Sequence, residues 1–457
     1  MDPIADYLAV HEDRFIADLL AYARFPSVSA QPKHSGDLKA CAGWIANRCR
    51  AIGLQTVVYE TTGNPVIVAK TPSSNPNKPT FLVYGHYDVQ PPEPFDLWDS
   101  PPFAPVIKGR NAYARGISDN KGQHLAHLNA VEAWLRSGRE LPCNLTFLIE
   151  GEEEVGSSAL YDFLPEHKVE LACDAVVISD SGIPTLKHPA LTYALRGIAA
   201  LEVRLTGPSR DLHSGIYGGS IENPAMALCQ LLGKLRDARG RITVPGYYDD
   251  VVKLSAYERK QLAKLPFKAE AYRKFLGVPQ LFGEAGFTPD EQRTARPTLE
   301  INGLTSGYQG DGSKTIIPSW ASAKLTLRLV PGQKPAKAIK AVTAHLKKLC
   351  PPTVKLTVTP GHGGAPYLVS PTSAFAQAAL RALKTGFGHD AILLREGGSI
   401  PIVSAFQQHL KADTLLLGMA LPDDNPHSPN EKFSLDAYAA GSRMSAALWP
   451  ELAAAAK

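Results

Sequence analysis

Three short apolar runs in the first half of the chain each end directly in side chains that can bind a metal ion. The runs, each with the residues that follow it, are Phe81–Tyr84 with His86 and Asp88, Leu145–Ile149 with the acidic run Glu150–Glu154, and Ala175–Ile178 with Asp180. Runs of this length, rich in β-branched and aromatic residues, are typical of buried strands. Because ligands lie outside the carboxyl ends of the strands in an open α/β sheet, all three runs would present their side chains to one crevice.

A histidine and a carboxylate two residues apart lie on the same side of an extended chain, because the side-chain period of a strand is two. Asp88 could therefore hold the imidazole of His86 in one tautomer while the other ring nitrogen faces a metal ion. A histidine and an aspartate that merely cap the exit of a strand explain this stretch, taken alone, equally well. The interpretation as a metal site depends on the other two runs.

The acidic run Glu150–Glu154 supplies more carboxylate than one metal ion needs. Carboxylates that follow buried strands so closely would repel one another, and a cation removes that repulsion. One glutamate of the run would then bind metal, and its neighbour would act as a general base on a metal-bound water. A solvated acidic turn is the alternative, and it is the weaker one once the strand context is counted.

Two further candidate ligands lie in loops. Asp119 belongs to the loop Gly116–Gly122, which leads into a helix, and the order of strands in the sheet could bring it to the same crevice. His427 is the best candidate in the C-terminal segment because its loop is polar and flanked by prolines, whereas His409 follows a helical run. Two histidines and three carboxylates suit two divalent ions that share one carboxylate, with zinc as the first choice and manganese or cobalt as alternatives.

The order of strands and helices predicts two domains, as does the length of 457 residues. Strand–loop–helix alternation in residues 1–196 and 365–457 predicts an α/β domain with a mixed or parallel sheet and helices on both faces. Residues 197–364 instead predict a smaller α+β domain, a split βαβ-like layer inserted into the first domain. Within it, residues 240–297 form a mixed, largely helical insert. At the N-terminus, the apolar spacing predicts one helix over residues 3–24.

Composition narrows the classes of function. With 44% hydrophobic and 20% charged residues, the chain has the make-up of a globular protein. Its most basic stretch, Glu258–Lys274, carries acids within it and is interpreted as a solvated helix, so nucleic-acid binding is not supported. No apolar run reaches membrane-spanning length, and the first residues lack the pattern of a signal peptide. Six scattered cysteines without a CxxC pair predict reduced thiols and therefore a cytoplasmic protein.

Seven motifs are spread over nearly the whole chain: YGHYDVQPP, ARGISDNKGQ, EGEEEVGS, SRDLHSGIYGG, KTIIPSWASAKLTLRLVP, REGGSIP and HSPNEKF. Together they make the chain similar to the M20 family of co-catalytic metallopeptidases, and within it to the carnosinase-like branch of cytosolic dipeptidases. Each motif alone would be a weak signal, whereas the combination is highly specific. The resemblance identifies residues 197–364 as a lid and dimerisation domain, with residues 240–297 similar to the longer lid of the dipeptidase branch.

The resemblance implies a place for each metal ligand. His86 and Asp180 would bind one metal ion, and Glu154 and His427 would bind the other. Asp119 would bridge the pair and would be followed by a cis peptide bond. This division matches the set of two histidines and three carboxylates found from the residues themselves.

The resemblance also implies three catalytic roles. Glu153 would be the general base, and Asp88 would orient His86. His213, in the inserted domain, would reach the active site of the partner subunit and help to stabilise the oxyanion. A homodimer with this histidine shared between subunits is therefore expected.

Substrate-binding roles follow from the same resemblance. Arg328 would hold the C-terminal carboxylate of the substrate, a task for which the guanidinium fork is suited. Without the family, Arg328 is more simply interpreted as a surface charge on a strand. Gly398 and Ser399 would contact the substrate through backbone and hydroxyl groups, and without the family they indicate only a turn.

Three positions depart from the family pattern. Asn120 stands where relatives often have aspartate, and Gln123 stands where a small residue or a proline is common. The segment Ser181–Ile183, which follows Asp180, is less bulky than in the carnosinase-like enzymes. None of these positions is a ligand, but the last leaves the shape of the substrate pocket open.

The sequence therefore predicts a metal-dependent hydrolase that cleaves the peptide bond of dipeptides or short peptides with a free C-terminal carboxylate. A water between two metal ions would be activated by Glu153, and the oxyanion would be held by metal and by His213 of the other copy. An N-acyl-amino-acid deacylase or a carboxypeptidase with the same chemistry is the first alternative, so an acylated amino acid is the other possible substrate. A metal-dependent binding or scaffold protein is the second, and it is disfavoured because the base and every ligand position are present.

Overall fold

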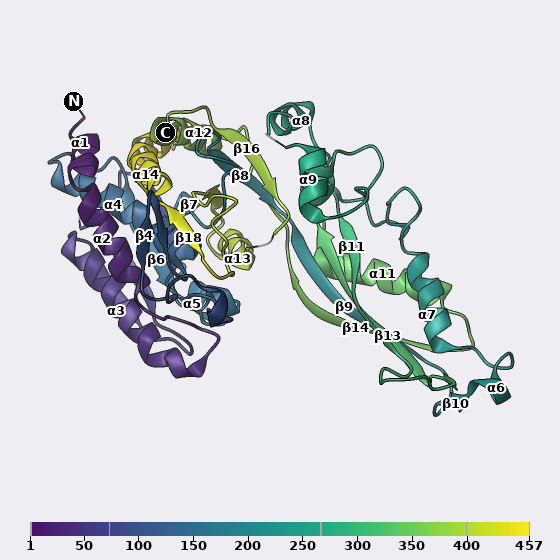
Figure 1. The fold of residues 1–457 in the computed structure, drawn as a ribbon. Helices are drawn as coiled ribbons and strands as arrows, with labels where there is room; N and C mark the ends of the chain where they lie inside the picture. The colour runs from purple at the N-terminus through teal and green to yellow at the C-terminus, as the bar shows by residue number, and fades with distance from the viewer. Residues whose placement is uncertain (1, 73, 266, 399, 457) are drawn as a thin grey trace.

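The computed structural model describes residues 2–72, 74–265, 267–398 and 400–456, and within them two large β-sheets organise the chain (Figure 1). The larger sheet has nine strands in the described residues, with β16 (Ile392–Glu396) pairing with β8 at one end. The other strands are, in sheet order, β1 (Gln55–Tyr59), β2 (Val66–Lys70), β6 (Asn144–Glu150), β3 (Thr80–His86), β7 (Ala175–Ile178), β17 (Asp413–Leu417), β8 (Ala190–Leu195) and β15 (Tyr367–Leu368).

The centre of this sheet is parallel, one edge is antiparallel, and at the other end β8 pairs antiparallel with β15 and parallel with β16. Strand β3 runs parallel to both β6 and β7, with Phe81 opposite Leu145 on one side and Ala175 on the other. Strand β17 runs parallel to β7 but antiparallel to β8, and β1 and β2 are antiparallel. The three apolar runs thus form adjacent parallel strands whose carboxyl ends lie at one edge, as the sequence predicts for a mixed α/β sheet.

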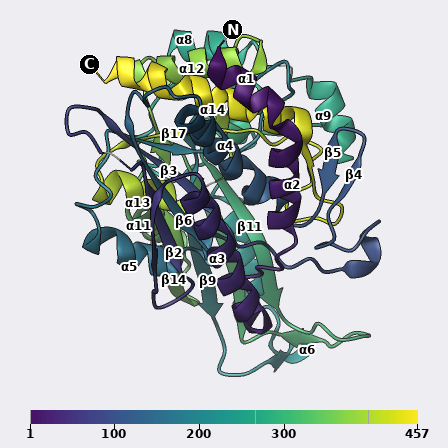
Figure 2. The ribbon, with the colours of Figure 1, turned by 90° about the vertical axis from the view of Figure 1, so that its left-hand side faces the viewer.

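Helices cover both faces of the large sheet. On β3, the ring of Phe81 packs against Phe375 of α12 and the ring of Tyr84 packs against Phe406 of α13, with centroid distances of 5.9 and 5.4 Å. Successive side chains of a strand point to opposite faces, so these two helices lie on opposite sides. The helices of this part are α1 (Pro3–Val10), α2 (Glu12–Ala23), α3 (Ser35–Ala51), α4 (Gln123–Arg136), α5 (Ser158–Glu166), α12 (Ala374–Phe387), α13 (Pro401–His409) and α14 (Leu435–Ala455). The N-terminal three lie in front of the sheet in Figure 2.

The N-terminal helix is interrupted once. The sequence predicts one helix over residues 3–24, whereas α1 ends at Val10 and α2 begins at Glu12. His11 between them leaves the helical conformation, its Nδ1 lies 2.9 Å from the carbonyl oxygen of Tyr7, and its ring stacks on Tyr7 with centroids 3.9 Å apart. This local contact replaces one residue of regular helix.

The smaller sheet has its own hydrophobic core. Its four strands, in sheet order, are β11 (Thr298–Ser306), β13 (Trp320–Leu329), β9 (Gly197–Thr206) and β14 (Lys355–Gly364). Helices α7 (Pro224–Gly233) and α11 (Pro335–Leu349) pack on one face of this sheet, where leucines such as Leu325 and Leu327 meet Leu228 and Val342. In chain order these elements read strand–helix–strand–strand–helix–strand, which is the predicted pattern.

Short elements complete the fold. At the far end of the smaller sheet lie β10 (Leu212–His213), α6 (Ser214–Tyr217) and β12 (Ile316–Ile317), whereas β4 (Val106–Lys108), β5 (Asn111–Tyr113) and β18 (Lys432–Ser434) form a small sheet beside the large one (Figure 1). All six cysteines are free thiols. Among the residues that the structure describes, no helix is long and apolar enough to cross a membrane.

The insert between α7 and β11 contains α8 (Ala256–Leu262), α9 (Ala269–Leu276) and α10 (Pro289–Thr294). The interpretation of Glu258–Lys274 as one solvated helix is wrong, because the stretch forms two helices and Glu258 is buried. Its carboxylate lies 2.6 Å from the guanidinium of Arg395, which is buried on β16 of the large sheet. Breaking such a buried pair costs about 3–5 kcal/mol, so this contact anchors the insert to the large sheet.

Candidate metal centre

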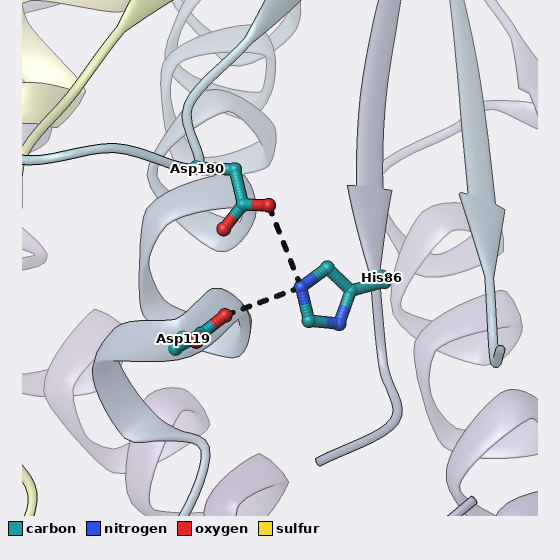
Figure 3. A group of neighbouring side chains, drawn as sticks. All are labelled: His86, Asp119 and Asp180. Atoms are coloured by element: carbon teal, nitrogen blue, oxygen red, sulfur yellow. Dashed lines mark ion pairs between the residues drawn. The ribbon is translucent and has the colours of Figure 1, made fainter. Parts of the chain in front are cut away.

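Three of the predicted ligands converge at the carboxyl edge of the large sheet (Figure 3). His86 ends β3, Asp180 follows β7, and Asp119 comes from the loop before α4. Nε2 of His86 lies 3.3 Å from Oδ1 of Asp119 and 3.7 Å from Oδ2 of Asp180. The imidazole is fully buried, and Nε2 has no hydrogen-bond partner among the described residues. A buried ring nitrogen that faces two carboxylates in this way suits a shared cation.

A second group of ligands uses the same aspartate. Nε2 of His427 lies 2.9 Å from Oδ2 of Asp119 and 3.4 Å from Oε2 of Glu154. In each group the possible ligand atoms lie within 4.8 Å of one another. Because Asp119 turns one oxygen to His86 and the other to His427, the five predicted ligands form two adjacent groups joined by one carboxylate. This donor set fits two divalent ions with a bridging aspartate.

Backbone hydrogen bonds hold the bridging aspartate in place. The peptide bond from Asp119 to Asn120 is cis, as the family resemblance implies. The backbone N–H groups of Ser118 and Asp119 donate to the carboxylate of Glu431 at 3.0 and 3.1 Å, and the buried Glu431 pairs with Arg115 at 2.7 Å. Glu431 was not among the predicted site residues. Its place in the motif HSPNEKF, four residues after His427, was the available signal.

Asp88 connects the histidine of β3 to the acidic run. Nδ1 of His86 lies 3.1 Å from the carbonyl oxygen of Asp88 and 3.3 Å from its Oδ1. The same carboxylate accepts hydrogen bonds from the backbone N–H groups of Glu153 and Glu154 at 3.3 and 3.1 Å. A proton on Nδ1 would therefore point at Asp88 and leave the lone pair of Nε2 for a cation, which supports the predicted orienting role.

The glutamates of the acidic run differ in what their carboxylates contact. Oε1 of Glu150 accepts from the hydroxyl groups of Tyr84 and Ser157, and the carboxylate of Glu152 accepts from the backbone N–H groups of Asn64 and Ala159. Both carboxylates are therefore engaged in local structure. Glu153 and Glu154 remain to face the ligand groups.

Burial and crowding shift the acidity of these groups. Burial and the nearby Asp119 raise the pKa of Glu154 to about 8. Burial, with further contributions from Asp180 and Glu154, raises the pKa of Glu153 well above its usual value, although His86 opposes the shift. Crowded carboxylates of this kind are costly to bury, and a divalent cation would compensate that cost.

A cavity of about 820 Å³ opens next to the ligand groups. Asp119 and Asp180 border it on one side, and Leu265 and Arg293 of the insert border it on the other. Gly398, a predicted substrate contact, also lines this cavity. Ser399, the other predicted contact of the same motif, lies outside the described residues.

Two of the predicted site residues, Arg328 and His213, lie away from the candidate ligands in the single chain. Arg328, on β13, borders a second cavity of about 630 Å³ between the smaller sheet and the insert. His213 is exposed at β10, which Figure 1 shows at the end of the smaller sheet that lies farthest from the large sheet. The single chain therefore brings Glu153 and Asp88 to the five candidate ligands but does not bring His213 to them.

Comparison with known proteins agrees with this arrangement. The model of peptidase family M20/M25/M40 matches residues 82–451. The chain is 31% identical over 474 residues to the Cys-Gly metallodipeptidase dug1 of Schizosaccharomyces pombe, an alignment that covers 99% of this chain and 98% of that protein. It is 31% identical over 471 residues to the human Beta-Ala-His dipeptidase, with 99% of this chain and 93% of that protein covered.

Solved structures give the same picture. The M20 family metallo-carboxypeptidase Sso-CP2 from Sulfolobus solfataricus superposes with a TM-score of 0.81 at 30% identity, covering 96% of this chain and 99% of that chain. Human carnosine dipeptidase 1 superposes with a TM-score of 0.78 at 32% identity, covering 99% and 98%. These matches confirm the resemblance inferred from the seven motifs. The chain belongs to peptidase family M20/M25/M40.

Proposed function

We propose that this protein is a two-metal dipeptidase that hydrolyses dipeptides or short peptides with a free C-terminal carboxylate. The observation that carries the proposal is the pair of ligand groups joined by Asp119, with Glu153 beside them. The chain belongs to a family of peptidases. Two relatives that align with it over nearly their whole length are named as dipeptidases.

In this proposal each of the two metal ions has its own set of ligands. His86 and Asp180 would hold one ion, Glu154 and His427 the other, and Asp119 both. The unpartnered Nε2 of His86 and the raised pKa of Glu154 support the fit. Imidazole and carboxylate donors suit zinc first, with manganese or cobalt as alternatives. Bound there, two divalent ions would polarise the scissile carbonyl group and acidify a water.

Glu153 would carry the proton in this reaction. A glutamate carboxylate beside the ligand groups can take a proton and later return it, which is the task of a general base. Glu153 would take the proton of the attacking water and deliver it to the leaving amine. Asp88 would keep His86 oriented, and its hydrogen bonds to the backbone of Glu153 and Glu154 would keep the base next to the ligands.

A second copy of the chain would complete the site. Strand β11 is an edge of the smaller sheet and exposes Ile301 and Leu304, and near the far end of the sheet α6 exposes Ile216 and Tyr217. Unpaired sheet edges with apolar side chains favour association with another chain. We propose that this face forms a homodimer, which would let the exposed His213 of one copy reach the ligand groups of the other and stabilise the oxyanion.

The division into domains belongs to the same proposal. Residues 1–196 and 365–457 would form the catalytic domain, and residues 197–364 the lid and dimerisation domain. Arg328, on the lid side, would bind the C-terminal carboxylate of the substrate, and Gly398 and Ser399 would contact the substrate from the catalytic side. A cytoplasmic location stays a prediction from the sequence.

A substrate panel tests the proposal against its alternatives. Protein loaded in turn with zinc, manganese or cobalt would be offered dipeptides, matched tripeptides, and N-acetyl and N-succinyl amino acids, and release of free amine would be measured. We expect the dipeptides to be cleaved fastest. Activity confined to acylated amino acids would make the protein a deacylase, and equal rates on tripeptides would make it a carboxypeptidase. No turnover of any amide by the metal-loaded protein would reject the hydrolase proposal in favour of a binding protein.

A further inference from the structure

Two arginines meet where the cavity of the ligand groups adjoins the cavity of Arg328. Arg196 occupies the single position between β8 of the large sheet and β9 of the smaller one (Figure 1), and its Nε donates to the carbonyl oxygen of Gly397 at 3.1 Å. A Cβ atom on Gly397 would lie 2.8 Å from the backbone oxygen of Arg293 and 2.9 Å from Nη2 of Arg196. Both arginines therefore pack against the same glycine, which lines the cavity of the ligand groups.

The two cavities share this junction. Arg293 borders both cavities, and Arg196 borders the second one together with Arg328. In the proposed binding mode, a peptide with its scissile carbonyl group at the candidate metal ligands and its terminal carboxylate on Arg328 would pass Arg196 and Arg293 at this junction. The part of the peptide that passes them is its C-terminal residue.

Positive charge at the junction is only partly neutralised. Among the described residues Arg196 and Arg328 have no ion pair, and Arg293 has one, with Oδ1 of Asp290 at 2.6 Å. Burial and the positive charges of Arg328 and Arg293 lower the pKa of Arg196 to about 10. The guanidinium groups thus lie close enough to repel one another. An anion bound among them would relieve that repulsion.

Acidic side chains near the junction compensate part of this charge. Asp290 forms an ion pair with one guanidinium nitrogen of Arg293. Glu396, which lines the cavity of the ligand groups, also interacts with Arg293. Burial raises the pKa of Glu396, although the positive charge of Arg293 opposes the shift. Glu300 lies near Arg196 but is exposed to solvent. None of these acids makes an ion pair with Arg196, so its guanidinium keeps donors for a ligand.

We propose that Arg196 and Arg293 bind a second carboxylate, the side chain of an acidic C-terminal residue, and that the substrates are dipeptides ending in aspartate or glutamate. One terminal carboxylate can occupy the fork of Arg328 with two parallel hydrogen bonds. This leaves Arg196 without an anion and Arg293 with Asp290 as its one ion-pair partner among the described residues. A site built to pair with a charged group discriminates strongly against a neutral analogue, because its own charges are then left unpaired. This inference rests on the proposed dipeptidase function and specifies its substrate class.

The test compares Ala-Glu with Ala-Gln, two dipeptides of nearly the same shape that differ in one charge. For the metal-loaded wild-type protein we expect kcat/KM to be at least about tenfold higher for Ala-Glu, as for a charge-assisted hydrogen bond. Arg293→Gln and Arg196→Gln should each lower that ratio by about fivefold or more. Arg196→Lys should retain part of the preference, because it keeps the charge but loses the planar fork.

Two further variants make the test specific. Arg239→Gln removes an exposed arginine of the same insert that lines neither cavity, and it should leave the ratio unchanged. Asp290→Asn frees Arg293 from its ion pair and should raise the preference for Ala-Glu. The rate on Ala-Gln reports in every variant whether the protein is folded and active.

The outcomes separate this inference from the proposed function. Hydrolysis of Ala-Gln at the same rate as Ala-Glu, or a ratio that survives both glutamine substitutions, overturns the acidic subsite and leaves the dipeptidase proposal standing. If neither dipeptide is cleaved, the proposed function fails, and calorimetry with L-glutamate and L-glutamine decides the subsite. Tighter binding of glutamate that Arg293→Gln abolishes would support the subsite, and equal binding of the two amino acids would overturn it.

Discussion

The side-chain nitrogen of Asn120 lies 2.9 Å from Oδ1 of Asp180, so a neutral amide donates to this candidate metal ligand. The same nitrogen donates to the carbonyl oxygen of Ser179 at 2.6 Å, and the amide oxygen accepts from the backbone N–H of His86 at 3.4 Å. Asn120 thus connects the ends of β3 and β7 behind the ligands. An aspartate at this position could not donate either bond when ionised.

Replacing Asn120 with aspartate should therefore destabilise the metal-free protein. The carbonyl oxygen of Ser179 would lose its donor, and a second carboxylate would lie beside Asp180. We expect the free energy of unfolding to fall by about 1–3 kcal/mol without metal, and by less when bound cations neutralise the added charge. Urea unfolding with and without zinc measures both values. Asn77→Asp, at an exposed position, is the matched control, and an equal loss in both metal states would contradict this account.

The shared histidine can be tested by mixing inactive subunits. His213→Ala and Glu153→Gln proteins should each have little activity alone, and neither should lose its metal. After subunit exchange, a hybrid dimer has one site with Glu153 from one copy and His213 from the other. Activity should then return to about a quarter of the wild-type value, because half of the dimers carry one intact site of two. Verified exchange without any gain would show that His213 does not act between copies.

Buried His127 predicts a pH dependence of stability. Its Nδ1 and Nε2 lie 2.8 Å from the hydroxyl oxygens of Ser445 and Ser179, and burial lowers its pKa to about 3. In the unfolded chain the pKa of histidine is about 6.5, so between these values only the unfolded chain binds the proton. The contribution of His127 to the free energy of unfolding should therefore fall by about 1.4 kcal/mol for each pH unit as the pH decreases from 6.5.

A substitution isolates this contribution. Urea unfolding of metal-free wild-type and His127→Gln proteins between pH 4.5 and 7 should give curves that converge as the pH falls, because the variant no longer has this proton to take up on unfolding. His389→Gln, at an exposed position, should run parallel to the wild type. A wild-type and a His127→Gln curve that stay parallel would mean that His127 does not resist protonation in the folded protein.

The candidate ligands could be predicted from the sequence because their positions follow from local pattern. His86 and Asp180 come directly after apolar strands, and the parallel order of those strands brings their ends together. Asp119, Glu154 and His427 were each predicted from a short motif in their own stretch of sequence. A residue pattern of short range was therefore enough to assemble this part of the site.

Other features depend on contacts between distant segments, which a local pattern does not contain. Glu431 reaches the backbone of Asp119 from 312 positions away in the chain. Glu258 in a charged stretch is buried because Arg395, 137 positions later, pairs with it. Which glutamates of the acidic run are engaged in local structure depends on partners such as Tyr84 of β3, whose hydroxyl group donates to Glu150 of the neighbouring strand β6. Only the folded chain shows these pairings.

The arginine junction illustrates the same limit. Arg196, Arg293 and Arg328 come from the link between the sheets, from the insert and from the smaller sheet. Each is unremarkable in its own stretch of sequence, and Arg328 alone carried a family signal. Their proximity follows from how the insert docks between the two sheets.

Metal titration tests the central claim most directly. Metal-free protein would receive zinc in steps while bound metal and dipeptide hydrolysis are measured on the same sample, for the wild type and for Glu153→Gln. We expect both proteins to bind two ions per chain, wild-type activity to reach its maximum as the second ion binds, and the rate of the variant to be lower by about 10²–10⁴-fold. Full wild-type activity without bound metal, or an undiminished rate in Glu153→Gln, would contradict the account.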